Sequence, residues 1–594
     1  MSARALEERA RAAGVILDRP GENAAPVPEA TMRALADMLG EAPDPPPSAH
    51  RAAFVPEWLD HTRTFGVALQ LYQLRSARNL GIGDLGDLKA LIDAFAEEGA
   101  DFVGLNPLHA LFTADPERAS PFSPSDRRFL NPMIIAVDEV PGYSADLLGD
   151  VLAGRGVPPS DERVDYAAVV PLKLAVLRAI HRRWRAGDRR VPDAARRAAV
   201  RFADRGGGAL MNFAVFEALS HHMVAAGHPA GWWDWPAAYH DPTGEAVRAF
   251  AATEDETVDF HVWLQFIADD QLAATQAAAR AAGMRIGLYL DLAVGSAPDG
   301  AATWSDPGLT LRGLRIGAPP DLFSLDGQDW GLAPMSPTAL VTRDFEPYLA
   351  ILAAVMGNAG AVRIDHAMGL ERLFLIPDDM PAVEGAYVRQ PGLVEEVVAA
   401  THAHRAIAIG EDLGVVPVGF RERMVARRIF STRILSFERD GMRMIPPARY
   451  PGDALACLST HDMAPLAAWW LGDEIELRLD LGRIDERVAR HERSARLVEK
   501  QLLLALSGLP ATRAEGRLDD AIVVAFHRTL ARTRSRLMAV RLEDVVGGRR
   551  LVNLPGTDHE HPNWRHTLPL DVEAVKGSEL LRRVLRTVRE ARGG

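Results

Sequence analysis

Eight short apolar, β-rich runs punctuate the chain after about residue 54, and a helical pattern follows each of them. They are VALQLY (67–72), DFVGLNPL (101–108), MRIGLYLDLAV (284–294), GAVRIDH (360–366), AIAIGEDLG (406–414), RILSFE (433–438), ALACLSTHD (454–462) and LMAVRLEDV (537–545). Strands that are apolar on both faces and alternate with helices indicate a parallel sheet. Eight such units favour a closed barrel over an open doubly wound sheet, so the predicted fold class is α/β, a (β/α)8 TIM barrel.

Two connections of this predicted barrel are much longer than ordinary loops. One spans about 107–284, after the second run, and the other spans about 471–535, before the eighth. Loops at the C-terminal face of a barrel build the substrate site, so we expect large insertions at that face and an extended ligand. The first insertion includes GWWDWP (231–236). We interpret these tryptophans as packing of the insertion itself, with stacking on sugars as the alternative.

Residues 1–50 are predicted to form a short helical appendage, separate from a catalytic barrel at 51–594. The appendage ends in the linker EAPDPPPSAH (41–50), where clustered prolines block a helix. The N-terminus lacks the apolar core of a signal peptide, and no run of about 18 apolar residues is present. We therefore expect a cytoplasmic protein with no membrane association.

Charge and cysteine content exclude several classes of function. The chain has 67 basic and 80 acidic side chains, a net charge of −13, and no basic stripe, so nucleic acid is not an expected partner. Its one cysteine, Cys457, excludes an intrachain disulfide and a cysteine-based metal cluster. The flanking sequence ALACLST predicts a buried strand thiol.

The stretch GIGDLG (81–86) fits the G-x-G-x-x-G pattern of dinucleotide-binding loops. The fit is poor, because eight residues separate the preceding apolar run from Gly81. Asp84 would also place a carboxylate in a loop that has to hold phosphates. We interpret the stretch as a glycine-rich loop, with nucleotide binding as the weaker alternative.

Carboxylates end three of the predicted strands: Asp365, Glu411 with Asp412, and Asp462. Side chains at the C-terminal ends of barrel strands point into the active-site mouth, so these acids are expected to converge. Clustered like charges raise at least one pKa, which suits a general acid. Two carboxylates that flank a glycosidic bond, one nucleophile and one acid/base, form the machinery of a retaining glycosidase, and a third would orient or distort the sugar.

Neighbouring residues support this interpretation and also leave alternatives. Arg363 shares a strand face with Asp365 and would hold it ionised, while His461 precedes Asp462 as a donor for sugar hydroxyls. Asp412 is better explained as a helix cap or ion-pair partner. A divalent metal held by Asp365, His366, His461 and Asp462 is the alternative, although no known ligand spacing is present.

Three segments resemble the catalytic motifs of the 4-α-glucanotransferases, the amylomaltases, in order and spacing. These are VRIDHAMGL (362–370), IGEDLGVVP (409–417) and STHDMAPL (459–466). Further similar segments cover nearly the whole chain after about residue 60: GIGDLGDL, SPFSPSDRRFLNP, LYLDLAVG, GAPPDLFSLDGQDWG, GAYVRQPG, NLPGT and PNWR. The pattern is most similar to the bacterial, maltose-utilising type. In that family GIGDLGDL follows the first barrel strand and binds no nucleotide.

The resemblance implies a role for each matching residue. Asp365 would be the nucleophile, Glu411 the acid/base, and Asp462 the carboxylate that grips sugar hydroxyls in the transition state. The residues implied to bind substrate around them are Arg363, His461, Asp291, Gln328, Trp330 and Phe122. Phe122 departs from the family, which usually has Tyr there, so stacking on the sugar would remain while one hydroxyl contact is lost.

The implied function is a 4-alpha-glucanotransferase that moves α-1,4-glucan segments between maltooligosaccharides by retaining double displacement. Glucose or a maltodextrin would be the acceptor, and neither cofactor nor metal would be needed. Two alternatives stay open at this point. One is an α-amylase-like hydrolase on the same barrel, and the other is a non-catalytic glucan-binding protein.

Overall fold

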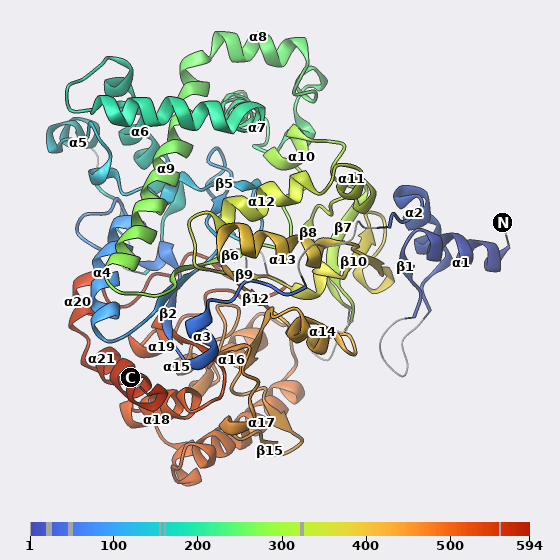
Figure 1. The fold of residues 1–594 in the computed structure, drawn as a ribbon, viewed down its shortest axis with the longest axis vertical. Coiled ribbons are helices and arrows are strands. Elements are labelled where there is room, and N and C mark those ends of the chain that lie inside the picture. The colour runs from blue at the N-terminus through green and yellow to red at the C-terminus, as the bar shows by residue number, and fades with distance from the viewer. Residues whose placement is uncertain are drawn as a thin grey trace.

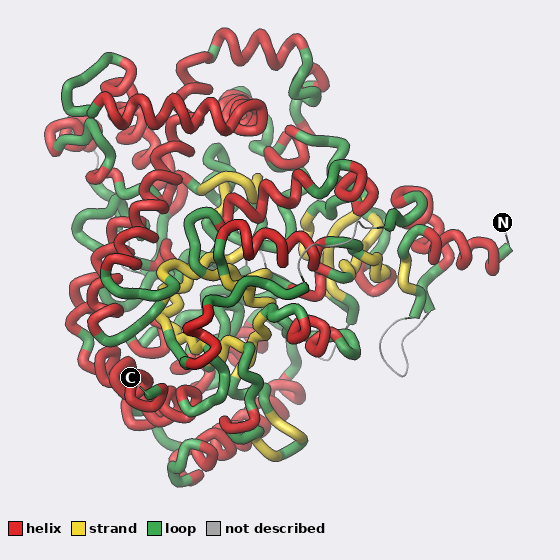
Figure 2. The backbone as a smooth tube through the Cα atoms, in the orientation of Figure 1, coloured by secondary structure: helices red, strands yellow, loops and turns green. Residues whose placement is uncertain are grey.

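The computed structural model describes residues 2–18, 26–44, 51–153, 156–159, 162–320, 326–557 and 560–593. Eight parallel strands at its centre close into a barrel, and helices surround them (Figures 1 and 2). In barrel order the strands are β2 (Gly66–Leu69), β3 (Phe102–Leu105), β6 (Gly287–Leu292), β9 (Ala361–Ile364), β12 (Ile407–Gly410), β13 (Phe430–Ile434), β16 (Ala454–Cys457) and β17 (Leu537–Arg541). The predicted (β/α)8 barrel is confirmed.

Six of the eight strands lie inside the predicted apolar runs, β2 begins one residue before its run, and the sixth strand departs from its run. The run at 433–438 was expected to form that strand, but β13 begins at Phe430 and ends at Ile434. All five residues of β13 are buried, whereas Phe437 is 50% exposed in the turn that follows. The strand therefore coincides with the segment that is buried between its neighbours. The prediction from apolar character alone placed this strand too late in the chain.

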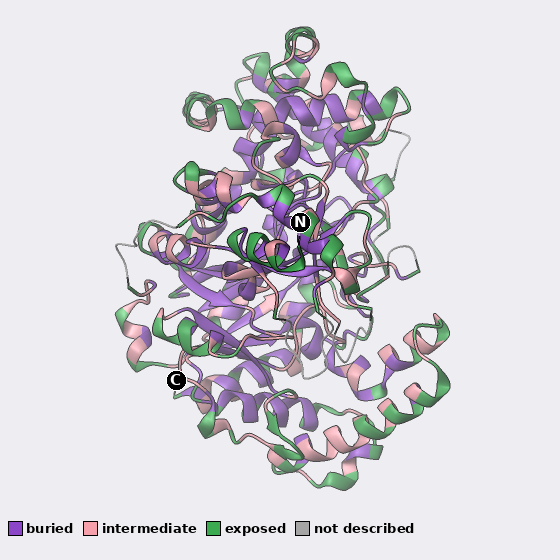
Figure 3. Cartoon of the chain, turned by 90° about the vertical axis from the view of Figure 1, so that its right-hand side faces the viewer, coloured by how far each residue is buried: buried purple, intermediate pink, exposed green. Residues whose placement is uncertain are grey.

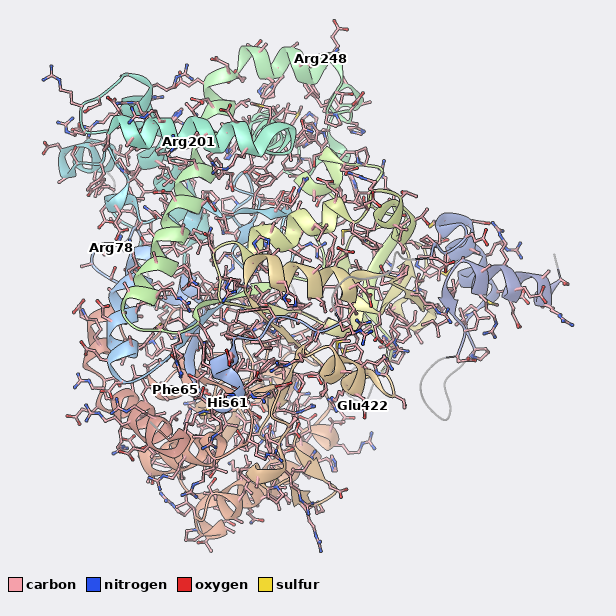
Figure 4. All side chains as sticks on the ribbon, viewed as in Figure 1. His61, Phe65, Arg78, Arg201, Arg248 and Glu422 are labelled. Carbon is pink, nitrogen blue, oxygen red and sulfur yellow. The ribbon has the colours of Figure 1, made fainter. Side chains whose placement is uncertain are left out.

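The loop at 81–86 caps the N-terminus of the first barrel helix, α4 (Leu85–Glu97). The Asp84 carboxylate accepts hydrogen bonds from the backbone N–H groups of Gly86 and Asp87, and Asp87 completes a capping box. Arg78, beside α4 in Figure 4, contacts the same carboxylate at 2.5 Å. A bound phosphate would need the N–H groups that Asp84 already occupies, so the dinucleotide alternative is wrong.

A layer of long helices fills the connection between β3 and β6. It consists of α5 (Ala145–Leu152), α6 (Tyr166–Arg185), α7 (Asp193–Ala225), α8 (Glu245–Thr253) and α9 (Asp255–Ala281), and Arg201 and Arg248 mark it in Figure 4. Trp232 and Trp235 are each 3% exposed and belong to its core, as the packing interpretation predicted. Trp233 is 43% exposed and lies at the surface.

A five-stranded antiparallel sheet lies beside the barrel and joins the N-terminal appendage to the rest of the chain. Its order is β1 (Val15–Ile16), β11 (Ala386–Arg389), β10 (Arg372–Pro377), β7 (Leu314–Ala318) and β8 (Gln328–Leu332). The appendage helices α1 (Ala3–Ala12) and α2 (Glu29–Leu39) pack on this sheet and project to the right in Figure 1. Residues 45–50 of the predicted linker lie outside the described residues.

The second long connection, between β16 and β17, is also helical. It holds α15 (Leu466–Leu471), α16 (Asp473–Asp480), α17 (Glu486–Leu506) and α18 (Asp520–Ala531), and α21 (Glu579–Arg592) then packs on α18. The division of the chain at residue 50 and the insertion limits stay predictions.

Burial is concentrated at the barrel, and exposed residues lie mainly on the peripheral helices (Figure 3). Cys457 is the buried strand thiol that the sequence predicted. No helix in the described part of the chain is both long and apolar enough to span a membrane.

Candidate active site

Three carboxylates line one open cavity of about 860 Å³ at the carboxyl ends of the barrel strands. Asp365 directly follows β9, Glu411 directly follows β12, and Asp462 lies in the loop after β16. The first two continue the strand ladder, because the Asp365 N–H donates to Leu292 O at 3.1 Å and the Glu411 N–H donates to Ile364 O at 3.0 Å. Their backbones are therefore fixed by the barrel itself.

Arg363 links two of the predicted site residues from inside the barrel. Its Nη1 lies 2.8 Å from both carboxylate oxygens of Asp291, and its Nη2 lies 2.7 Å from Asp365 Oδ1. The pairing of β6 with β9 places Asp291 directly opposite Arg363, so all three side chains share the inner face. Burial raises the pKa of Asp365 to about 6, while the guanidinium opposes that rise. Asp365 is thus mainly a carboxylate at neutral pH, aimed by Arg363.

Glu411 is held by two backbone donors, and its pKa is higher than that of Asp365. Its Oε2 accepts from the His366 N–H and its Oε1 from the Leu413 N–H, both at 3.1 Å. Burial raises its pKa to about 8, and the nearby charge of Asp365 adds to the rise. His366 has a left-handed backbone with φ of 45°, which is strained for a non-glycine residue and turns its N–H toward Glu411.

Asp462 has the opposite electrostatic environment. His461 Nε2 lies 3.2 Å from Asp462 Oδ2, and Asn553 Nδ2 lies 3.4 Å from Oδ1. Burial favours a higher pKa, but the attraction of His461 and Arg363 outweighs it and lowers the pKa of Asp462 to about 2. Asp462 therefore stays ionised through the whole range in which the other two titrate.

Aromatic rings hold His461 in place. Phe122 stacks on His461 with 4.8 Å between ring centroids and an angle of 15°, and Trp564 packs on Phe122 at 5.2 Å. Trp564 itself has a positive φ of 59°. Phe122 thus lines the cavity beside the third carboxylate, and the hydroxyl of a tyrosine is absent from this wall.

Gln328 and Trp330 form the wall that faces the barrel mouth. Both lie on β8, where the indole Nε1 of Trp330 donates to Gln328 Oε1 at 3.1 Å. Trp330 also meets His366 edge to face at 5.0 Å. Seven of the nine predicted site residues line this cavity, and the other two contact lining residues: His461 contacts Asp462, and Asp291 contacts Arg363.

Asp412 makes structural contacts, and the described residues contain no group suited to a metal ion. Asp412 accepts from Arg421 Nε at 2.7 Å and from the Thr432 N–H at 2.8 Å, so it is the ion-pair partner that was expected. Within the described ranges, no three His, Cys, Asp or Glu side chains form a group suited to a metal ion.

Sequence reasoning assigned no role to several residues of the cavity. Asn553 and Trp564 come from the NLPGT and PNWR segments near the C-terminus, which were noted only as similar segments. Glu117 and Arg565 meet at 2.8 Å at the rim, although 448 positions separate them. These residues lie in loops, which have no strand or helix periodicity. The similar segments NLPGT and PNWR contained Asn553, Trp564 and Arg565 but gave them no role, and no quoted segment contained Glu117.

Comparisons with known proteins agree on one family. A family model described as 4-alpha-glucanotransferase matches residues 69–571. The 4-alpha-glucanotransferase of Mycobacterium bovis is 37% identical over 536 residues, covering 86% of this chain and 72% of the relative. That of Haemophilus influenzae is 33% identical over 558 residues, covering 90% of this chain and 79% of the relative.

Solved structures show the same relationship. The amylomaltase from Corynebacterium glutamicum superposes with a TM-score of 0.78 at 31% identity, covering 90% of this chain and 76% of that one. An amylomaltase from Streptococcus agalactiae in complex with acarbose has a TM-score of 0.71 at 20% identity and covers 89% of this chain and 98% of that one. At that identity the second comparison shows the fold alone.

Proposed function

Because the chain belongs to the 4-alpha-glucanotransferase family, we propose that Asp365, Glu411 and Asp462 are the catalytic residues of a retaining glucan transfer. The enzyme is a 4-alpha-glucanotransferase, and α-glucans are its substrates. The finer assignment of donors, acceptors and residue roles is our proposal. The single observation that carries it is the convergence of three carboxylates on one cavity, with Arg363 bonded to Asp365.

In the first step an Asp365 oxygen attacks the anomeric carbon of an α-1,4-linked glucose. The bond from that carbon to the leaving glycosidic oxygen breaks, and Glu411 donates its proton to this oxygen. The pKa of Glu411, about 8, keeps the required proton in place near neutral pH. The products are a shortened glucan with a free 4-hydroxyl and a β-linked glucosyl ester on Asp365.

In the second step the 4-hydroxyl of an acceptor sugar attacks the same carbon. Glu411, now a carboxylate, takes the hydroxyl proton, and the ester bond to Asp365 breaks. Two inversions restore the α configuration. Maltooligosaccharides are the proposed donors, and glucose or a maltodextrin is the proposed acceptor.

Asp462 and Arg363 are proposed to stabilise the positively charged sugar between these steps. Asp462 remains ionised because His461 stabilises its charge, so it can accept hydrogen bonds from sugar hydroxyls as the ring distorts. Arg363 balances the charge of Asp365 when that residue becomes the leaving group. No step requires a group that the chain itself does not supply.

The shape of the cavity supports transfer rather than hydrolysis. At about 860 Å³ it is much larger than one glucose unit needs, and Trp330 offers an indole face on which an acceptor ring can stack. An acceptor that fills this space excludes the water that would otherwise hydrolyse the ester.

The test is to incubate the purified protein with maltotriose alone and follow chain lengths and reducing ends together. Transfer predicts glucose plus a ladder of longer maltodextrins at a constant number of reducing ends. Shortening with rising reducing ends would instead support the hydrolase, and an unchanged substrate would support the non-catalytic glucan-binding protein.

A further inference from the structure

The loop that carries His461 and Asp462 has no regular structure between β16 and α15. Its position therefore depends on contacts from outside the loop. We propose that Arg541, the last residue of the neighbouring strand β17, and Asp544, in the short helix α19 (Leu542–Val545) that follows, are positioning residues that fix Asp462 for glucan transfer. This proposal rests on the role given to Asp462 above.

Arg541 closes a tight turn around the two site residues. The Met463 N–H donates to Thr460 O at 3.1 Å, which makes His461 and Asp462 the central residues of that turn. Arg541 Nη1 bonds the carbonyl oxygens at both corners, Thr460 O at 2.7 Å and Met463 O at 2.8 Å. It also lies 3.2 Å from Ser459 Oγ. One guanidinium thus fixes the backbone on both sides of Asp462.

Asp544 fixes the point where the loop ends. Its Oδ1 accepts from the Leu466 N–H at 2.6 Å, at the first residue of α15. Asp544 is 4% exposed, so water does not compete for this bond. Glu543 Oε1, 3.4 Å from Arg541, in turn holds the guanidinium.

Arg541 and Asp544, with their bonds to the loop, form a clamp on Asp462, and Arg541 lies directly beneath the site. Arg541 lines a cavity of about 70 Å³ together with Asp291, Arg363 and His461. Arg541 is 5% exposed, and a buried guanidinium that bonds backbone carbonyls keeps one fixed geometry. A shift of this group would move the turn, and with it the distance from Asp462 to the sugar.

Arg536 provides a control that lies away from the loop. It precedes β17 at the opposite end of the barrel, where it pairs with Asp453 and lies 3.6 Å from Asp60. Arg536→Met removes the same kind of charge without touching the loop. Arg541→Lys retains the charge, but its side chain is one atom shorter, so its ammonium does not reach the position from which Nη1 bonds both carbonyls.

The first experiment measures kcat and KM for maltotriose disproportionation in these variants. We expect Arg541→Lys to lower kcat about 10- to 100-fold with KM within about threefold, because misplacing a catalytic group by about 1 Å has an effect of this size. Arg536→Met should keep kcat within about twofold. Equal losses in both variants, or none in Arg541→Lys, would overturn the proposal.

A double-variant cycle separates positioning from general stabilisation. If Arg541 acts through Asp462, Arg541→Lys should change the residual kcat of Asp462→Asn by less than about twofold. Losses that multiply would show that Arg541 acts in another way and overturn the proposal.

If the Arg541 variants do not fold, two variants of Asp544 provide an independent test. Asp544→Asn retains an acceptor oxygen for the Leu466 N–H and should keep kcat within about threefold, while Asp544→Leu should lose about tenfold or more. Equal kcat values would overturn the clamp. A wild-type enzyme that makes no ladder contradicts the proposed function, whereas a normal ladder in every variant contradicts only the clamp.

Discussion

Asp365, Glu411 and Asp462 share one cavity yet bind their protons with very different affinities. Burial raises the pKa of all three, so the neighbours of each residue make the difference. Arg363 opposes the rise at Asp365 and at Glu411, the charges of Asp365 and Asp462 add to the rise at Glu411, and His461 reverses it at Asp462. One carboxylate is thereby suited to attack, one to donate a proton, and one to remain charged.

These pKa values predict a bell-shaped dependence of kcat/KM on pH. Activity should rise as pH increases through about 6, because Asp365 must lose its proton to attack. It should fall as pH increases through about 8, because Glu411 must keep its proton to release the leaving group. Initial rates on maltotriose from pH 4 to 10 measure both limbs. With α-maltotriosyl fluoride, whose leaving group needs no acid, the alkaline limb should weaken; an unchanged limb would contradict the role of Glu411.

Phe122→Tyr tests the departure from the family pattern. The ring can keep its stacking on His461 while the new hydroxyl gains a contact with the donor sugar. We expect KM to fall about 2- to 10-fold, in line with about 0.5–1.5 kcal/mol for one hydrogen bond, and kcat to change little. Steady-state kinetics on maltotriose provide the check, and a kcat that rises by orders of magnitude would show that the hydroxyl is needed for the chemistry.

At the scale of elements, the loop at 81–86 shows how one pattern fits two structures. The glycines permit a tight turn, but Asp84 is 1% exposed and caps α4, with Arg78 at 2.5 Å and Lys173 at 3.9 Å. A residue that caps a helix and balances two cations has a structural role. In the sequence, two features separated this loop from a phosphate-binding one: the identity of Asp84 and the eight residues before Gly81.

Asp84→Ala should therefore destabilise the fold without affecting a ligand. The loss of the cap and of a buried ion-pair partner predicts a decrease of about 2–4 kcal/mol in the free energy of unfolding. Urea unfolding followed by circular dichroism measures it, with Asp93→Ala on the exposed face of α4 as the control. Equal stability of the two variants, or stabilisation of the wild type by NAD, would contradict this role.

The sequence predicted strands well because buried parallel strands have a strong local signal. Six apolar runs contain their whole barrel strand and a seventh misses only Gly66, and Asp365, Glu411 and Asp462 from these runs line the cavity. The sixth run failed because Phe437 is apolar but exposed, which no local pattern reveals. Gln328 and Trp330 were found only through resemblance, since β8 belongs to a sheet outside the barrel.

At the scale of the whole molecule, the site depends on contacts between distant parts of the chain. Asn553 reaches Asp462 across 91 positions, and Arg565 reaches Glu117 across 448. The appendage adds β1 to one edge of the five-stranded sheet, and the opposite edge, β8, carries Trp330. Such pairings have no periodic signature. Local patterns therefore predicted the barrel and its acids, whereas the wall residues Gln328, Trp330 and Phe122 were predicted only through resemblance.

The central claim is that Asp365 forms a covalent bond to the transferred glucan. Asp365→Asn should keep the fold and lower kcat by about four orders of magnitude or more, because the nucleophile is lost while its shape remains. Circular dichroism and the maltotriose assay check this expectation. Substantial residual transfer would contradict the assignment.

The most direct measurement is to trap the intermediate itself. Glu411→Gln, given α-maltotriosyl fluoride without acceptor, should form the ester because fluoride leaves unaided, and should hydrolyse it slowly because the base is missing. Proteolysis and mass spectrometry should then find one maltotriosyl group on the peptide that contains Asp365, and none when Asp365→Asn is added. A maltotriosyl group on any other residue, or none while the wild-type enzyme consumes the same donor, would contradict the account.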